Sequence, residues 1–317
     1  MKVIDHLKSA KKPFISFEIL PPIKGRNIDH LYNILDELME FKPPFINVTY
    51  HRAEYKYKKR ADGLLEKVYT RKRPGTVGIC AAIQNKYHVD AVPHLTCGGF
   101  TKEETEDALI DLNYLGIDNV LILRGDPAKN ETEFLPEPGG HNYAEDFVKQ
   151  VVELNNGDFM EEEISGDYST NFCIGVAGYP EKHYEAPNTD SDLKYLKQKI
   201  DAGADYIVTQ LFYDNQKYFD FVEKCKAAGI HVPIIPGLKP IATKKQLKML
   251  PRVFNCTIPM ELSKEIEKCK DNDAVKQLGV EWAIHQSQEL IKSGVPAVHF
   301  YTMSKTKQTV EIVKELV

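Results

Sequence analysis

The chain has 317 residues, a formal net charge of −5 and an isoelectric point near 6.1, which argues against a nucleic-acid surface because such a surface normally needs a basic stripe. No apolar run approaches the roughly 20 residues of a membrane span, and the amino terminus lacks the apolar core of a signal peptide. The six scattered cysteines form no C-x-x-C pair, so we expect neither a zinc site nor a disulfide framework, and a cytoplasmic location.

Short, mostly apolar runs alternate with helical stretches along the whole chain. The runs cover residues 14–20, 45–50, 90–96, 119–123, 172–177, 206–212, 232–238 and 297–302. This alternation predicts a parallel sheet, and eight strand–helix units close a (β/α)8 TIM barrel of the α/β class. We expect a single domain with long loops at its active face. In such barrels the chemistry lies at the carboxyl ends of the strands.

Glu18 interrupts the first run near its carboxyl end. A carboxylate among apolar neighbours has a raised pKa, because desolvation disfavours its charged form. Such a group can hold a proton near neutral pH and act as a general acid. The alternative is a carboxylate at the lip of the barrel, solvated or paired with a lysine.

The region between the second and third runs is harder to interpret. We expect the basic segment 55–60 to be a solvated loop or helix face, and residues 76–88 to be mostly helix. Pro93 is awkward inside the third run, because it removes a hydrogen-bond donor from the sheet. His94 near the end of this run is either a satisfied structural histidine or a ligand of the site.

The fourth run leads into Arg124, Gly125 and Asp126, which present a cation, an open backbone and an anion side by side. Asp126 precedes a proline, so it could be a helix N-cap. That alternative is weakened because a Gly/Pro-rich loop follows, to about residue 142. Loops of this length inside a compact domain are often functional.

Polar and aromatic groups also follow the fifth and sixth runs. Tyr179 and His183 could stack on a flat cofactor or simply pack at the rim. Gln210 is expected within the sixth strand, as a ligand of the site or as a layer residue bonded to a neighbouring strand. We expect 157–166 to be a surface excursion. The histidines are not spaced as a metal-binding set, so we assign no metal.

The chain contains no G-x-G-x-x-G, no G-x-x-x-x-G-K-[ST] and no G-x-S-x-G, so Rossmann binding, P-loop chemistry and a nucleophile elbow are not indicated. Other motifs lie at the strand ends: SFEILPP (16–22), NVTY (47–50), PHLTC (93–97), LILRGD (121–126), YA (143–144), GYPEKH (178–183), DAGA (201–204), TQLFYD (209–214), IPGL (235–238) and HFYT (299–302). Taken in order, these segments resemble the methylenetetrahydrofolate reductase family, in its short bacterial form with only the catalytic barrel.

The resemblance implies one FAD-binding barrel over residues 1–317. NADH or NADPH would pass hydride to the flavin, which would then reduce 5,10-methylenetetrahydrofolate to 5-methyltetrahydrofolate for methionine synthesis. One site would serve both substrates in turn, with ping-pong kinetics. The resemblance also implies a homodimer or homotetramer with small-molecule substrates.

The resemblance further implies roles for individual residues. Glu18 would be the general acid that protonates N10 of the folate, Asp126 would lie beside the flavin and the pterin, and Gln210 would bond the pterin. Leu250 and Lys305 stand where the family contacts substrate through Phe and Arg. The positions that would contact FAD are Thr49, His94, Leu123, Arg124, Gly125, Asp126, Tyr143, Ala144, Tyr179, His183, Asp192 and Lys199, with Lys199 near the pyrophosphate.

Some positions depart from the family pattern, and other readings remain open. Tyr195 and Gln198 replace Asn and Arg, which puts those adenosine or phosphate contacts in question. The enzymatic alternative is another flavin barrel, such as a proline dehydrogenase-like oxidoreductase. A folate- or nucleotide-binding barrel without activity, or a scaffold protein, would be a different class.

Overall fold

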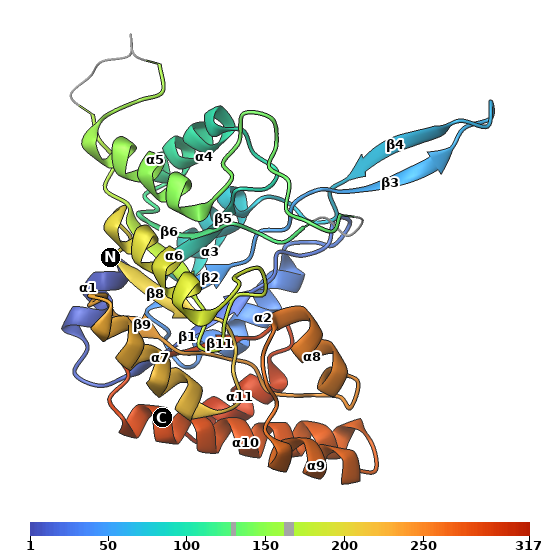
Figure 1. Cartoon of the computed structure of the whole chain (residues 1–317), viewed down its shortest axis with the longest axis vertical. Coiled ribbons are helices and arrows are strands. Elements are labelled where there is room, and N and C mark those ends of the chain that lie inside the picture. The colour runs from blue at the N-terminus through green and yellow to red at the C-terminus, as the bar shows by residue number, and fades with distance from the viewer. Residues whose placement is uncertain (128–130, 162–167) are drawn as a thin grey trace.

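The computed structural model describes residues 1–127, 131–161 and 168–317 (Figure 1). Nine of its strands form one parallel sheet in the order β10-β11-β1-β2-β5-β6-β7-β8-β9, which confirms the predicted α/β barrel. These strands are β1 (Phe14–Ile19), β2 (Phe45–Val48), β5 (Asp90–Thr96), β6 (Asn119–Leu123), β7 (Cys173–Gly178), β8 (Tyr206–Thr209), β9 (Ile234–Ile235), β10 (Gly237–Leu238) and β11 (Ala297–Tyr301).

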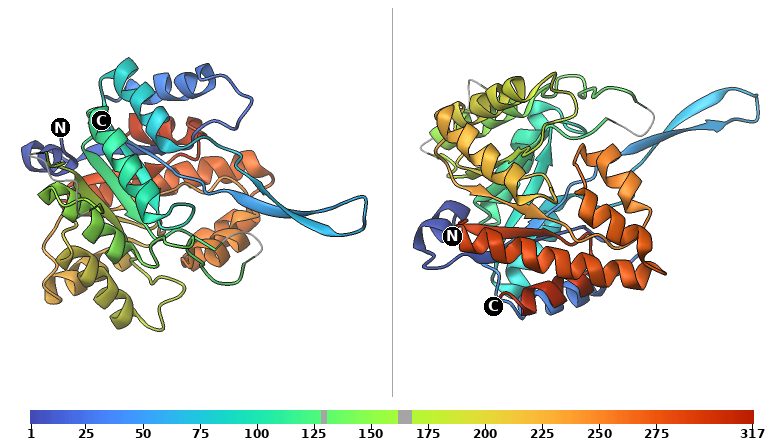
Figure 2. Two further views of the ribbon diagram at one scale, coloured as in Figure 1. Left: turned by 90° about the horizontal axis from the view of Figure 1, so that it is seen from above. Right: turned by 60° about the horizontal axis from the view of Figure 1, so that its bottom comes forward.

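The helices between the strands surround this sheet (Figures 1 and 2). They are α1 (Val3–Ser9), α2 (Asp29–Met39), α3 (Thr76–Tyr87), α4 (Lys102–Tyr114), α5 (Ala144–Asn156), α6 (Thr189–Asp201), α7 (Asn215–Ala227), α8 (Gln246–Phe254), α9 (Met260–Lys268), α10 (Asn272–Lys292) and α11 (Lys307–Lys314). The expectation of helix over 76–88 is confirmed by α3. The excursion expected at 157–166 lies partly outside the described residues.

The seventh predicted strand, 232–238, is divided in two. Pro236 separates β9, which pairs with β8, from β10, which pairs with β11. A proline has no N–H to give to the ladder, so the strand changes partner at this point. The carbonyl of Pro236 still accepts a hydrogen bond from His299 N at 2.9 Å. The barrel therefore closes through an interrupted strand.

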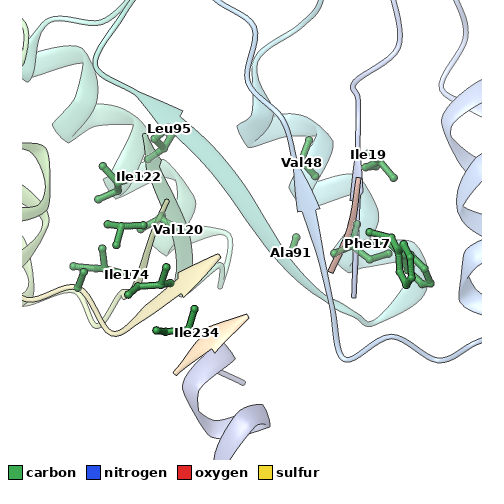
Figure 3. Packing of buried hydrophobic residues seen from close by; sticks show 14 of the residues in the cluster. Phe17, Ile19, Val48, Ala91, Leu95, Val120, Ile122, Ile174 and Ile234 are labelled. Atoms are coloured by element: carbon green, nitrogen blue, oxygen red, sulfur yellow. The ribbon is translucent and has the colours of Figure 1, made fainter. Parts of the chain in front are cut away.

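Alternate residues of the strands face the helices and the barrel interior. Val120 and Ile122 pack in the large outer core beneath the helices (Figure 3), while Leu121 belongs to the inner cluster together with Val92 and Tyr206. Strands buried on both faces are expected to be nearly continuous apolar runs, which is why eight of them are visible in the sequence.

The helix α1 was not predicted, and it covers the amino-terminal end of the barrel. Its Val3 is fully buried in the inner cluster, and Val3 N donates a 2.7 Å hydrogen bond to Asn119 Oδ1 at the start of β6. His6 Nε2 lies 2.6 Å from Asp90 Oδ2 at the start of β5. With this end covered, the opposite end of the barrel is left for a ligand.

The expectation of a loop or helix face over 55–60 is wrong. Strands β3 (Glu54–Lys59) and β4 (Leu65–Thr70) form an antiparallel hairpin that projects from the barrel (Figures 1 and 2). Tyrosine and lysine alternate along β3, and this period of two is the pattern of a strand. The hairpin follows β2, so it leaves the barrel on the side of the strand carboxyl ends.

All six cysteines are unpaired, and five are buried, whereas Cys269 at the end of α9 is partly exposed. Among the described residues no helix is long and apolar enough to cross a membrane. The same part of the chain holds no cluster of three or more His, Cys, Asp or Glu side chains placed to bind a metal ion.

Candidate active site

Glu18 is buried at the carboxyl end of β1, with only 8% of its surface exposed. Thr49, just after β2, donates a 2.8 Å hydrogen bond from Oγ1 to Glu18 Oε1. Burial raises the pKa of Glu18 to about 7, against the smaller opposing effects of the Thr49 hydrogen bond and the positive charge of Lys239. The carboxyl group is therefore partly protonated near neutral pH, as a general acid requires.

Two buried histidines stay neutral, one beside Glu18 and one paired with Ser16. Burial lowers the pKa of His94 and of His299 to about 3, and the charges of His299 and His51 add to this effect for His94. His94 Nε2 is 3.6 Å from Glu18 Oε2, and Asn47 Nδ2 is 3.2 Å from the same nitrogen. Because His94 is uncharged, it does not hold Glu18 in its ionised form.

Lys239 is a site residue that sequence reasoning missed. The register pairs Leu238 with Phe300 and Phe300 with Phe17, so the next level across these strands holds Lys239, Tyr301 and Glu18. Burial lowers the pKa of Lys239 to about 8, while the charge of Glu18 acts in the opposite direction. Lys239 could have been found only by aligning the predicted strands around the closed barrel, because the first and seventh strands are far apart in the sequence.

Asp126 follows β6 at the same end of the barrel and is exposed. No helix begins at Asp126, since residues 124–127 have no regular structure, so the N-cap alternative does not apply. Although solvent reaches the side chain, desolvation by the surrounding rim raises the pKa of Asp126, and the charges of Arg52 and His51 oppose this. Asp126 thus presents a carboxylate at the open mouth.

Gln210 lies one residue beyond β8 and not within the strand as predicted. Its backbone N donates to Gly178 O at 2.8 Å, which places it beside the end of β7. Its side-chain Oε1 accepts a hydrogen bond from Leu211 N at 2.9 Å. The Nε2 donors of the amide take no part in this bond. Glu18, Asp126 and Gln210 therefore all lie at the carboxyl end of the barrel, where parallel strands end together.

Arg124 directly follows β6, two residues before Asp126. Its guanidinium pairs with Glu185, donates to Asn142 O at 3.2 Å and stands 5.3 Å from the centre of the Tyr143 ring. Tyr143 is 59% exposed. A ring exposed to this extent beside a cation offers a face on which a flat aromatic ligand can stack.

A second basic group forms around β7 and α6. Lys199 Nζ donates to Ala177 O at 2.6 Å, and burial lowers the pKa of Lys199 to about 8 while Asp192 opposes this. Asp192 accepts a 3.0 Å hydrogen bond from His183 N. Burial lowers the pKa of His183 to about 4, and the charges of Lys199, Arg124 and Lys182 lower it further.

These residues fit a dinucleotide cofactor that carries phosphates and aromatic rings. The charges of Lys199, Arg124 and Lys182 act together on His183, so this part of the rim attracts anions. Gly125 has φ +87°, a conformation that side-chain-bearing residues rarely adopt, and a Cβ there would stand 3.3 Å from Thr96 Cβ. Tyr179 packs edge-on against His183 with 4.7 Å between ring centres.

The remaining predicted positions divide into two groups. Leu123 ends β6, Ala144 begins α5, Lys305 is exposed near Lys239, and Tyr195 and Gln198 lie on α6. Leu250 differs, because it is fully buried in a satellite cluster with Leu211, Tyr213 and Ile241. Leu250 is covered by protein atoms in this structure, and its contact with substrate stays a prediction.

Comparisons with known proteins agree with this arrangement. The family described as methylenetetrahydrofolate reductase matches residues 2–317. The methylenetetrahydrofolate reductase (NADH) 1 of Arabidopsis thaliana is 35% identical over 329 residues, covering 100% of this chain and 51% of its own length. The 5,10-methylenetetrahydrofolate reductase of Escherichia coli is 31% identical, covering 94% of this chain and 88% of its own.

The chain spans about half the length of the plant and yeast relatives it matches. Among solved structures, a Clostridium thermocellum protein described as binding two copies of 5-methyl-5,6,7,8-tetrahydrofolic acid superimposes with a TM-score of 0.57. It is 15% identical in sequence, with 98% of this chain and 96% of that chain covered. At this identity the similarity supports the barrel fold alone.

Proposed function

The chain belongs to the methylenetetrahydrofolate reductase family, and from that premise we propose that it reduces 5,10-methylenetetrahydrofolate to 5-methyltetrahydrofolate. The proposal includes FAD as the bound cofactor and NADH or NADPH as the hydride donor, with both substrates using the mouth of the barrel in turn. Residues 1–317 would then act as one catalytic unit. The observation that carries this proposal is the buried Glu18 carboxyl group with its raised pKa.

Glu18 would supply the proton for the folate half-reaction. A methylene bridge between two nitrogens is reduced only after one C–N bond breaks, and the departing nitrogen then needs a proton. A carboxyl group with a pKa of about 7 is protonated often enough at neutral pH to give it. Thr49 keeps this group oriented through its 2.8 Å hydrogen bond.

Asp126 and Gln210 would act on the same substrate from the other side of the mouth. The Asp126 carboxylate favours a cationic form of the substrate, because a negative charge stabilises a nearby positive one. The Gln210 amide can donate to acceptor atoms of a pterin ring. Both roles follow from their position at the carboxyl ends of β6 and β8.

The flavin, when bound, supplies the carrier that accepts hydride from the nicotinamide and gives it to the folate. The phosphates of the flavin would be held by Arg124 and Lys199. The backbone of Gly125 would contact the cofactor, and Tyr143 would cover one of its rings. Arg124 is paired with Glu185 in this structure, so binding of a phosphate would exchange one anionic partner for another.

The test separates the two half-reactions of the purified, flavin-loaded protein under anaerobic conditions. We expect Glu18→Gln to leave flavin reduction by NADH or NADPH close to the wild-type rate. The same variant should slow reoxidation of the flavin by methylenetetrahydrofolate by roughly 10²–10⁴-fold, the usual contribution of a general acid.

A matched control is Glu106→Gln. Glu106 is a carboxylate with the same 8% exposure, but it lies on α4 and accepts a hydrogen bond from Met160 N, away from the barrel mouth. Both half-reactions should persist in this control. Full folate activity in Glu18→Gln would remove Glu18 from the mechanism, and a protein that binds no flavin would contradict the proposed function itself.

A further inference from the structure

The hairpin of β3 and β4, residues 54–70, forms a two-stranded sheet of its own. It extends clear of the barrel in all three views (Figures 1 and 2), and its two strands pair only with each other. A two-stranded hairpin alone is marginally stable in water.

One face of this hairpin is aromatic and basic. The register pairs Tyr55 with Tyr69 and Tyr57 with Lys67, and pairing partners lie on the same face of a sheet. Lys67 Nζ stands 4.0 Å from the centre of the Tyr55 ring. Tyr57 and Tyr69 are 57% and 62% exposed, and the neighbouring Leu65 is 67% exposed. So much exposed apolar surface in one short element marks an interaction site.

The charge of this region is opposite to that of the rest of the chain. Residues 54–70 contain five basic and three acidic side chains, a formal charge of +2. Because the whole chain carries −5, the other residues carry −7. The hairpin is therefore attracted to acidic surfaces such as those of another copy of the same chain.

The chain also contains a surface groove of matching character, with a volume of about 780 Å³ between the starts of α7 and α9 and the side of α10. Its described lining includes no Lys or Arg but four carboxylates, Asp214, Glu261, Glu281 and Glu289. Met260, which is 68% exposed, and Trp282 supply its apolar surface. Aromatic rings and lysines are the side chains that such a groove accommodates.

We propose that the hairpin docks, through its Tyr57–Lys67–Tyr69 face, into the acidic groove of a second copy of this chain. The hairpin does not reach the groove of its own chain, since it projects from the upper part of the molecule while α9 and α10 lie at the bottom (Figure 1). Reciprocal exchange of two hairpins gives a closed two-fold dimer. Because the exchange is reciprocal, the dimer buries two copies of the hairpin–groove contact. A standard stable interface buries roughly 1,600 Å² in total.

The first test measures the mass of the full chain in solution by light scattering, over a range of concentrations. We expect a dimer for the wild type and a monomer for Tyr57→Thr/Tyr69→Thr, since threonine keeps the strand propensity while the aromatic face is lost. The control Lys58→Thr/Glu66→Thr changes a cross-strand pair on the opposite face and keeps the net charge, so it should remain a dimer.

A second test identifies the groove and does not depend on the stability of the tyrosine variant. Lys67→Glu and Glu281→Lys should each weaken the dimer through like-charge contacts. The two variants combined in one chain should restore it, because the reversed charges attract again.

A third test maps the contact directly. A zero-length carbodiimide cross-linker joins lysines to carboxylates, and mixing isotope-labelled with unlabelled chains separates links between chains from links within one. We expect links between chains from Lys59 or Lys67 to Glu261 or Glu281.

Several results would overturn the proposal. A wild-type monomer at every concentration, or a dimer that survives both the tyrosine and the charge variants, would do so. Links from the hairpin to surfaces other than the groove would also contradict it. A monomer whose hairpin variants lose only the rate of substrate capture would identify an electrostatic steering element instead.

Discussion

At the scale of single residues, the site depends on which charges reach Glu18. The carboxyl group is desolvated, the neighbouring His94 is neutral, and Lys239 is the cation that lowers the pKa of Glu18. Glu18 was found in the sequence because a carboxylate inside an apolar run is unusual. Lys239 could not be found in this way, because a lysine just after a strand is ordinary and its proximity to Glu18 comes from barrel closure.

Replacing Lys239 by Met should raise the pKa of Glu18. Loss of a nearby positive charge disfavours the ionised carboxylate, so the protonated acid persists to higher pH. The folate half-reaction of the wild type should decline as pH rises through about 7, and in Lys239→Met this midpoint should move up by roughly one pH unit. Stopped-flow rates of flavin reoxidation against pH measure the shift.

The difference between the two proteins should shrink above pH 8, because the pKa of Lys239 is itself lowered to about 8 and its charge is lost there. Lys307→Met on the exposed side of α11 is the matched control and should leave the profile in place. A midpoint that stays fixed or moves to lower pH in Lys239→Met would show that Lys239 does not act on Glu18.

At the scale of elements, the strands and most helices were predictable, and the exceptions have physical causes. Buried parallel strands leave apolar runs, which are visible directly in the sequence. The hairpin was missed because its Tyr/Lys alternation does not bury a face against the barrel. The helix α1 was missed because it is only seven residues long and is held by tertiary contacts to Asp90 and Asn119.

Asn119→Ala should loosen α1 and destabilise the barrel. Asn119 is 2% exposed, accepts from Val3 N at 2.7 Å and donates to Met1 O at 3.0 Å, so its loss leaves the buried Val3 N–H without a partner. Such a loss costs about 1–3 kcal/mol. Urea denaturation measures this change, with the exposed Asn27→Ala as a control that should unfold like the wild type.

Hydrogen exchange would show where this effect acts. We expect Asn119→Ala to speed exchange in α1 more than in the strands, because only the helix that covers the amino-terminal end of the barrel opens. Unchanged urea midpoints in Asn119→Ala would mean that α1 contributes little to stability.

At the scale of the whole molecule, the barrel closes at its weakest strand. The halves β9 and β10 are two residues each, and Gly237 N donates to Thr209 Oγ1 at 3.0 Å to join them to β8. A Cβ on Gly237 would stand 2.3 Å from Thr209 O and 2.6 Å from the Tyr301 ring. Closure therefore requires a residue without a side chain at this position.

Gly237→Ala should lower the free energy of unfolding by about 3 kcal/mol or more, because neither backbone nor ring can move aside without opening the barrel. The midpoint of urea denaturation measures the loss. The control Gly78→Ala lies on the exposed side of α3 with no atom within 4 Å, and should stabilise the protein slightly, by about 1 kcal/mol. Equal midpoints for Gly237→Ala and wild type would contradict this account of closure.

The distribution of thiols over the fold has a practical consequence. Burial raises the pKa of Cys97, Cys173, Cys225 and Cys256 to about 12, and thiols kept in this form react slowly. Cys269 is the cysteine that solvent partly reaches, and it packs on the same satellite cluster as Trp282, the single tryptophan of the chain. A maleimide dye coupled to Cys269 would thus be an energy-transfer acceptor for a native fluorophore, without any cysteine having to be removed.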